Sequence, residues 1–133
     1  MKSKNTILTA LYHEAVSYFT TITGSVYKQT RPTNSTAEDC IISIIEGGVD
    51  KFTQYGRVFI KIYYADLFTN DTYEENLTRG SVLQTQMFEF SEYILTRNIQ
   101  VAIQVNSRRV STVPMPPDTT KEHYVLLTFD YLY

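Results

Sequence analysis

The chain has 133 residues, a length that suits one domain with a single core. Its apolar content of 43% and charged content of 20% are ordinary for a globular protein and exclude a disordered chain. The formal net charge of −2 argues against nucleic acid as the main ligand, because neutralising phosphates takes an excess of Lys and Arg.

The first element expected is an amphipathic helix over Met1–Thr23. Its apolar side chains recur at helical spacing and form one stripe. Asn5 or Thr6 can cap the start of this helix, and Gly24 suits the position just past its end.

Three strands are expected next, at Ser25–Thr30, Asp39–Glu46 and Gly56–Leu67. The third alternates most regularly, with Val58, Ile60, Ile62 and Tyr64 on one face. Gly47 and Gly48 are expected to end the second strand, and Val49–Tyr55 to form a turn.

A second helix is expected up to about Arg97. Thr72 and Glu75 have the spacing of a capping box at its start. Its apolar stripe includes Tyr73, Leu77, Leu83, Met87, Phe90 and Ile94. Gly80 lies inside that stripe, which predicts either a close helix–sheet contact or a break in the helix.

The last two elements predict an antiparallel hairpin with a long tip. Asn98–Val105 alternates strictly, and Val110–Val113 can extend that strand. Pro114–Asp118 cannot form the ladder of a central strand, and Glu122–Tyr133 then alternates again. Residues 1–133 therefore predict one α+β domain, in the order α-β-β-β-α-β-β, with two helices on one face of a mainly antiparallel five-stranded sheet.

Motifs for catalysis or metal binding are lacking in this sequence. His13 and Glu14 begin an H-E-x-x-H pattern, but Ser17 stands where the second ligand is needed. Cys40 falls in an apolar strand, where a thiol is inert, and as a single cysteine it allows no intrachain disulfide. No apolar run is long enough to predict a membrane span. We therefore expect no enzyme activity, no cofactor, no metal site and no membrane partner.

The candidate interface residues lie in two polar segments. The predicted hairpin tip combines charge with restricted backbone freedom, in Arg108, Arg109, Val113, Pro114, Met115, Pro116 and Pro117. Because proline reduces the entropy lost on binding, this tip can be a docking arm, and the alternative is a solvated hairpin tip. Asp66 and Asp71 belong to an acidic segment that helix capping also explains.

The order of these elements resembles the tail-completion proteins of long-tailed bacteriophages, also called tail-terminator or head–tail joining proteins. The resemblance is carried by the following segments: the N-terminal helix with Leu11, Tyr12 and Ala15, the Gly24–Tyr27 strand, the Pro-containing loop before an apolar strand, the Val58–Tyr64 strand, the Leu77–Leu95 helix, and the last strand with His123, Leu126 or Leu127, and Phe129.

The resemblance implies a function without catalytic residues. It implies a structural protein of a phage or prophage that forms a ring, commonly a hexamer, at the end of the tail tube. Its partners would be other copies of itself, the tail tube protein and the head connector protein. Its location would be the virion, after assembly in the host bacterial cytoplasm. The alternatives are a small ligand-binding α+β domain using Tyr63 and Tyr64, and a nucleic-acid-binding module using Lys28, Arg31, Arg108 and Arg109.

Overall fold

The computed structural model describes residues 3–50, 53–96, 104–114 and 122–132, of which 46–50, 53–54, 95–96, 104–114 and 132 are described by backbone alone. Two helices occur in the described residues, α1 (Lys4–Tyr18) and α2 (Leu77–Thr96). The strands are β1 (Val26–Lys28), β2 (Cys40–Asp50), β3 (Thr53–Ala65), β4 (Leu67–Thr69), β5 (Thr72–Glu74), β6 (Gln104–Pro114) and β7 (Glu122–Leu132).

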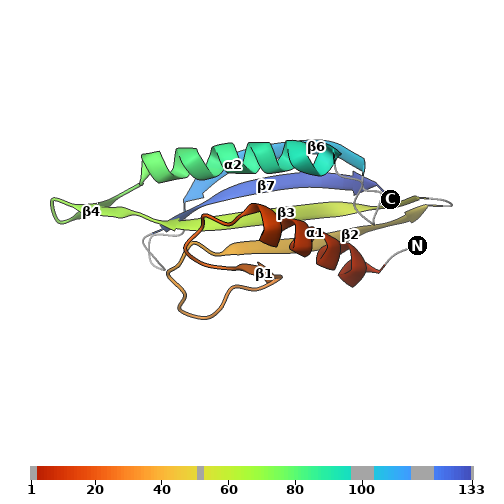
Figure 1. Ribbon diagram of the computed structural model, residues 1–133, viewed down its shortest axis with the longest axis horizontal. Coiled ribbons are helices and arrows are strands. Elements are labelled where there is room, and N and C mark those ends of the chain that lie inside the picture. The colour runs from red at the N-terminus through yellow and green to blue at the C-terminus, as the bar shows by residue number, and fades with distance from the viewer. Residues whose placement is uncertain (1–2, 51–52, 97–103, 115–121, 133) are drawn as a thin grey trace.

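Five of these strands form one mixed sheet with the order β1-β2-β3-β7-β6 (Figure 1). β1 runs parallel to β2, and the other neighbours are antiparallel, including the hairpin of β6 and β7. The α+β class and the mainly antiparallel sheet are therefore confirmed. β3, the strand with the most regular alternation, lies at the centre, as its two partners in register show.

Both helices cover the same face of this sheet. The alternating residues Val58, Ile60 and Ile62 of β3 are all fully buried. They pair in register with Ile44, Ile42 and Cys40 of β2 and with Phe129, Leu127 and Val125 of β7. On this layer α1 packs Ile7, Leu8 and Leu11, and α2 packs Leu83, Met87 and Ile94. The ring of Phe90 in α2 lies 4.8 Å from that of Phe19, which joins the two helical segments in one core.

The first helix is shorter than the sequence predicts. It begins after Ser3, whose Oγ accepts a hydrogen bond from Thr6 N at 3.1 Å, so the cap is neither Asn5 nor Thr6. The helix ends at Tyr18. Gly24 has a different role from the one expected, because a Cβ there would collide with Asp39 and the Glu38 backbone. It permits a close approach to the residues that lead into β2.

The predicted end of the second strand is also wrong. β2 passes through Gly47 and Gly48 to Asp50 and pairs with β3 from Thr53 onward. The register shifts between Glu46 and Gly48, which is the mark of a β-bulge. The glycines therefore allow an irregularity in a long strand, and most of the expected turn is strand.

The predicted capping box is a β-hairpin instead. Thr72–Glu74 forms β5, which pairs with β4, and Asn70 and Asp71 make the turn with φ angles of 51° and 62°. Asn and Asp tolerate positive φ better than other residues with side chains, and such a pair favours a two-residue hairpin turn. α2 begins later, at Leu77, where Asn76 Oδ1 accepts a hydrogen bond from Arg79 N at 3.1 Å. Tyr73 and Leu77 are exposed and do not belong to the core stripe.

Gly80 confirms the close helix–sheet contact that its position predicts. A Cβ on Gly80 would lie 2.7 Å from Tyr64 Oη and 3.0 Å from its Cζ. Tyr64 is 1% exposed, so its ring cannot move aside easily.

We expect Gly80→Ala to lower the free energy of unfolding by about 1–2 kcal/mol, although alanine favours a helix by about 1 kcal/mol over glycine. Urea denaturation measures this change, and the exposed neighbour Ser81→Ala is the control, with an expected change within about 0.5 kcal/mol. A Gly80→Ala variant as stable as the wild type would contradict the contact.

Candidate functional site

The predicted hairpin-tip residues fall mainly in a strand. Within β6, Arg108 pairs with Phe129, Arg109 with Thr128, Val113 with Tyr124, and Pro114 with His123. The expectation that Arg108 and Arg109 lie in the hairpin tip is therefore wrong, whereas Val110–Val113 extends the strand as predicted. β6 is the outermost strand of the sheet, and an edge strand tolerates polar residues and a terminal proline. The register shift between Val105 and Ser107 explains why the alternation breaks there.

Three candidate interface residues, Met115, Pro116 and Pro117, lie outside the described residues. So does most of the predicted strand Asn98–Val105, of which Gln104 and Val105 are described, as the start of β6. The predicted docking arm is therefore limited to the segment between β6 and β7. Its role in binding stays a prediction.

The two candidate acidic residues have separate environments. Asp66 is partly buried, and its Oδ1 lies 2.6 Å from His123 Nδ1 at the start of β7. The ring of His123 stacks on Tyr64 at 5.9 Å, and Tyr64 Oη donates a hydrogen bond to Glu75 Oε1 at 2.7 Å. Burial and then this bond to Glu75 raise the pKa of Tyr64. Asp66 therefore fixes the base of the β4–β5 hairpin, whereas Asp71 is exposed in its turn.

The face of the sheet opposite the helices, here called the open face, carries exposed apolar side chains. Ile45 is 57% exposed, and four further residues of this face are partly exposed: Phe59, Tyr63, Tyr124 and Leu126. Of these residues the sequence analysis selected Tyr63 alone, for the alternative of a ligand-binding domain. The signal was present in the aromatic and aliphatic residues at the odd positions of β2 and β3.

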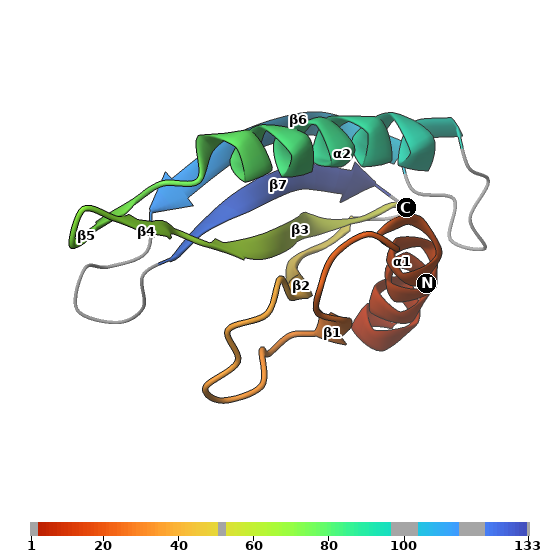
Figure 2. The same ribbon diagram turned by 60° about the vertical axis from the view of Figure 1, so that its left-hand side comes forward.

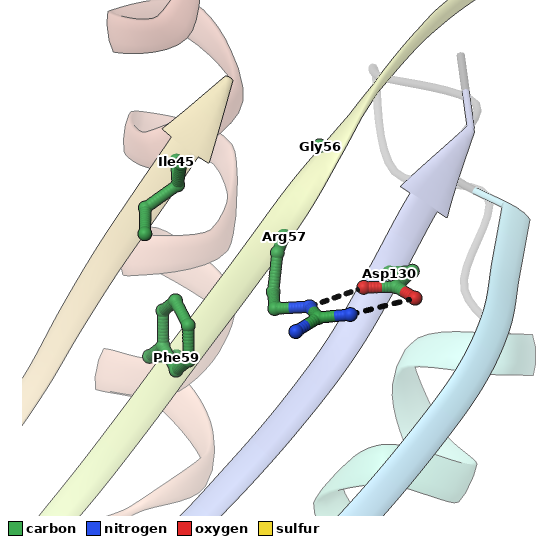
Figure 3. Close-up of a pocket in the computed structure, with 5 residues that line it drawn as sticks. All are labelled: Ile45, Gly56, Arg57, Phe59 and Asp130. Atoms are coloured by element: carbon green, nitrogen blue, oxygen red, sulfur yellow. Dashed lines mark hydrogen bonds and ion pairs between the residues drawn. The ribbon is translucent and has the colours of Figure 1, made fainter. Parts of the chain in front are cut away.

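An open hollow of about 320 Å³ lies on this face, lined by Ile45, Gly56, Arg57, Phe59 and Asp130 (Figure 3). The register places Ile45, Arg57 and Asp130 side by side on three adjacent strands. Arg57 Nε donates to Asp130 Oδ1 at 2.6 Å, and this bond raises the pKa of Arg57. The hollow thus combines apolar walls with an exposed ion pair.

The β4–β5 hairpin carries a second group of exposed apolar residues. Leu67 is 47% exposed, Phe68 60% and Tyr73 52%. The rings of Phe68 and Tyr73 lie 4.9 Å apart across the hairpin. Figures 1 and 2 show the hairpin extending beyond one end of the five-stranded sheet. Its sequence signal is the Asn70–Asp71 pair between two short β-prone segments.

Two cations considered for nucleic acid have partners within the chain. Lys28 Nζ donates to Thr9 Oγ1 at 3.0 Å. Arg31 Nε lies 2.9 Å from Asp39 Oδ2, and its Nη1 lies 2.7 Å from Glu122 Oε1. Burial alone lowers the pKa of Arg31, but hydrogen bonds to the two carboxylates raise it above the ordinary value. The Arg31 guanidinium also lies 4.1 Å from the centre of the Tyr63 ring.

Comparison with known proteins assigns no family to this chain. Neither a scan against protein-family models nor a search of curated proteins found a match. Among the described residues, no group of three or more His, Cys, Asp or Glu side chains is placed to hold a metal ion. No described helix is long and apolar enough to cross a membrane.

Proposed function

We propose that this chain is a non-enzymatic assembly protein of a phage or prophage that forms a ring at the end of the tail tube. The observation that supports this proposal is the open face, where Ile45 and Phe59 line a hollow on a sheet whose other face is covered by two helices. Contiguous exposed apolar surface on a small domain is typical of protein–protein contact sites. Aromatic residues, which are frequent in this chain, are enriched in such contacts.

The partners in this proposal are further copies of the chain, the tail tube protein and the head connector protein. A ligand-binding domain has less support, because Tyr64 is buried against α2 and Tyr63 lies beside the Arg31 ion pairs. Arg31 and Lys28, two of the cations that a nucleic-acid module would use, are engaged within the chain.

Electron microscopy of tail tubes tests the proposal. The chain is mixed with tubes polymerised from the tube protein encoded near its gene, and added density is expected at one end of each tube. Ile45→Asp, which places a charge on the open face, is expected to abolish that density. The control is Val16→Asp on the exposed side of α1, at 44% exposure, which should leave it unchanged. Tube ends that gain no density with the wild-type chain would refute the proposed function.

A further inference from the structure

The β4–β5 hairpin has the features of a projecting contact element. Within the described chain, β4 and β5 pair only with each other, and every residue of both strands is exposed. Phe68 remains 60% exposed although its ring contacts Tyr73. Such an aromatic pair gains little from folding alone, and a partner that covered it would bury a large apolar area.

The hairpin is held in place at its base. Asp66 precedes β4 and is bound to His123 of β7, while Glu75 follows β5 and accepts a hydrogen bond from Tyr64 of β3. Both ends of the hairpin are therefore tied to the central strands of the sheet. A pre-ordered element loses less conformational entropy on binding than a loose loop does.

The hollow lies along the N-terminal part of β3, whereas the hairpin follows the C-terminal end of β3. Phe59 of β3 lines the hollow, and Leu67 begins the hairpin eight residues further along the chain. At about 3.3 Å per residue, these two positions are roughly 26 Å apart. The hairpin of one chain therefore cannot enter the hollow of that same chain, whereas the hairpin of a second copy can.

We propose that the β4–β5 hairpin of one copy binds in the Ile45–Phe59 hollow on the open face of the next copy. The charges of the two surfaces are complementary. Asp71 and Glu74 are exposed on the hairpin, and Lys61 lies on the open face of β3, while the charge of Arg57 is balanced by Asp130. Because the two surfaces differ, each copy can give its hairpin to one neighbour and receive a hairpin from another, and this head-to-tail contact generates a ring where the rotation closes. This inference rests on the proposed function and assigns the contact that builds its ring.

The contribution of the hairpin to the contact between copies is tested by comparing the self-association of matched variants. We expect Phe68→Asp to raise the dissociation constant between copies roughly tenfold or more, as the loss of a central aromatic contact does. Phe88→Asp is the control, because Phe88 is 51% exposed on α2, away from both surfaces. Analytical ultracentrifugation measures association, and circular dichroism verifies that each variant is folded. Equal effects of the two substitutions, or no effect of Phe68→Asp, would overturn the proposal.

Mixing two variants tests the head-to-tail arrangement. Phe68→Asp leaves the hollow intact, and Ile45→Asp leaves the hairpin intact, so each alone should be monomeric while their mixture forms only a dimer. A contact between like surfaces, hairpin with hairpin or hollow with hollow, would not be restored by mixing. The absence of mixed dimers would therefore refute the contact between hairpin and hollow.

Cysteine crosslinking detects the contact even where association is weak. The double variant Phe68→Cys with Ile45→Cys should give covalent chains longer than dimers under a mild oxidant, whereas either single variant stops at dimers. Cys40 does not interfere, because it is fully buried. The absence of longer chains at the highest soluble concentration overturns the proposal. Crosslinked rings that fail to bind tail tubes would refute the proposed function and leave this contact standing.

Discussion

Met87→Asp is expected to lower the free energy of unfolding by about 3–5 kcal/mol, the range found when a charge is buried without a partner. Met87 is fully buried in the middle of α2. It belongs to the cluster that joins α2 to both α1 and the sheet, so an aspartate has neither water nor a cation available there. Urea denaturation followed by circular dichroism measures the change.

Thr85→Asp is the matched control for this substitution. It introduces the same residue into the same helix, two positions away, at an exposed site. Its effect should stay within about 0.5 kcal/mol, as is usual for surface substitutions. If the two variants lost similar stability, α2 would pack on the sheet through a different face.

Arg31→Met is expected to lower the free energy of unfolding by about 3 kcal/mol, since it leaves buried carboxylates without their cation. Asp39 is 1% exposed and Glu122 is 5% exposed, and Arg31 forms an ion pair with each. Arg31 Nη2 also donates to Ala37 O at 2.9 Å, so the guanidinium holds the loop before β2 to the start of β7. Chemical denaturation at neutral pH measures the loss.

Two comparisons show whether burial causes this effect. Arg57→Met removes the exposed ion pair with Asp130 and should change the free energy of unfolding far less, because water already screens such a pair. The neutral triple variant Arg31→Met, Asp39→Asn and Glu122→Gln should recover part of the stability that Arg31→Met loses. A loss at Arg31 no larger than that at Arg57 would mean that Asp39 and Glu122 are hydrated.

The main layers of the fold could be predicted from the sequence because each follows from a local period. Val58, Ile60 and Ile62 alternate along β3, and this alternation alone assigns them to one face. The helical spacing of Leu83, Met87 and Ile94 likewise identified the buried stripe of α2. Both patterns result from burial on one side of a regular helix or strand. They can therefore be recognised in the sequence without knowing which other elements pack on that side.

Predictions from local sequence were wrong where one sequence pattern is compatible with two different structures. Thr72 and Glu75 have capping-box spacing, but the positive φ angles of Asn70 and Asp71 make a hairpin turn there. Gly47 and Gly48 are typical of a strand end, yet pairing with β3 carries β2 past them. In the first case the Asn70–Asp71 pair was a competing local signal, whereas in the second the outcome depends on hydrogen bonds with another strand.

The sequence by itself determined the α+β class, the central strand, the buried helix stripe and the absence of a recognisable catalytic motif. Only the tertiary structure decided that Arg108 and Arg109 lie in an edge strand, that Asp66 is engaged by His123, and that Arg31 reaches Glu122. The hollow of Ile45, Phe59 and Asp130 was likewise invisible in the sequence, because its walls come from three strands. Strand order and register set such sites, and they are fixed by long-range pairing and burial rather than by neighbouring residues.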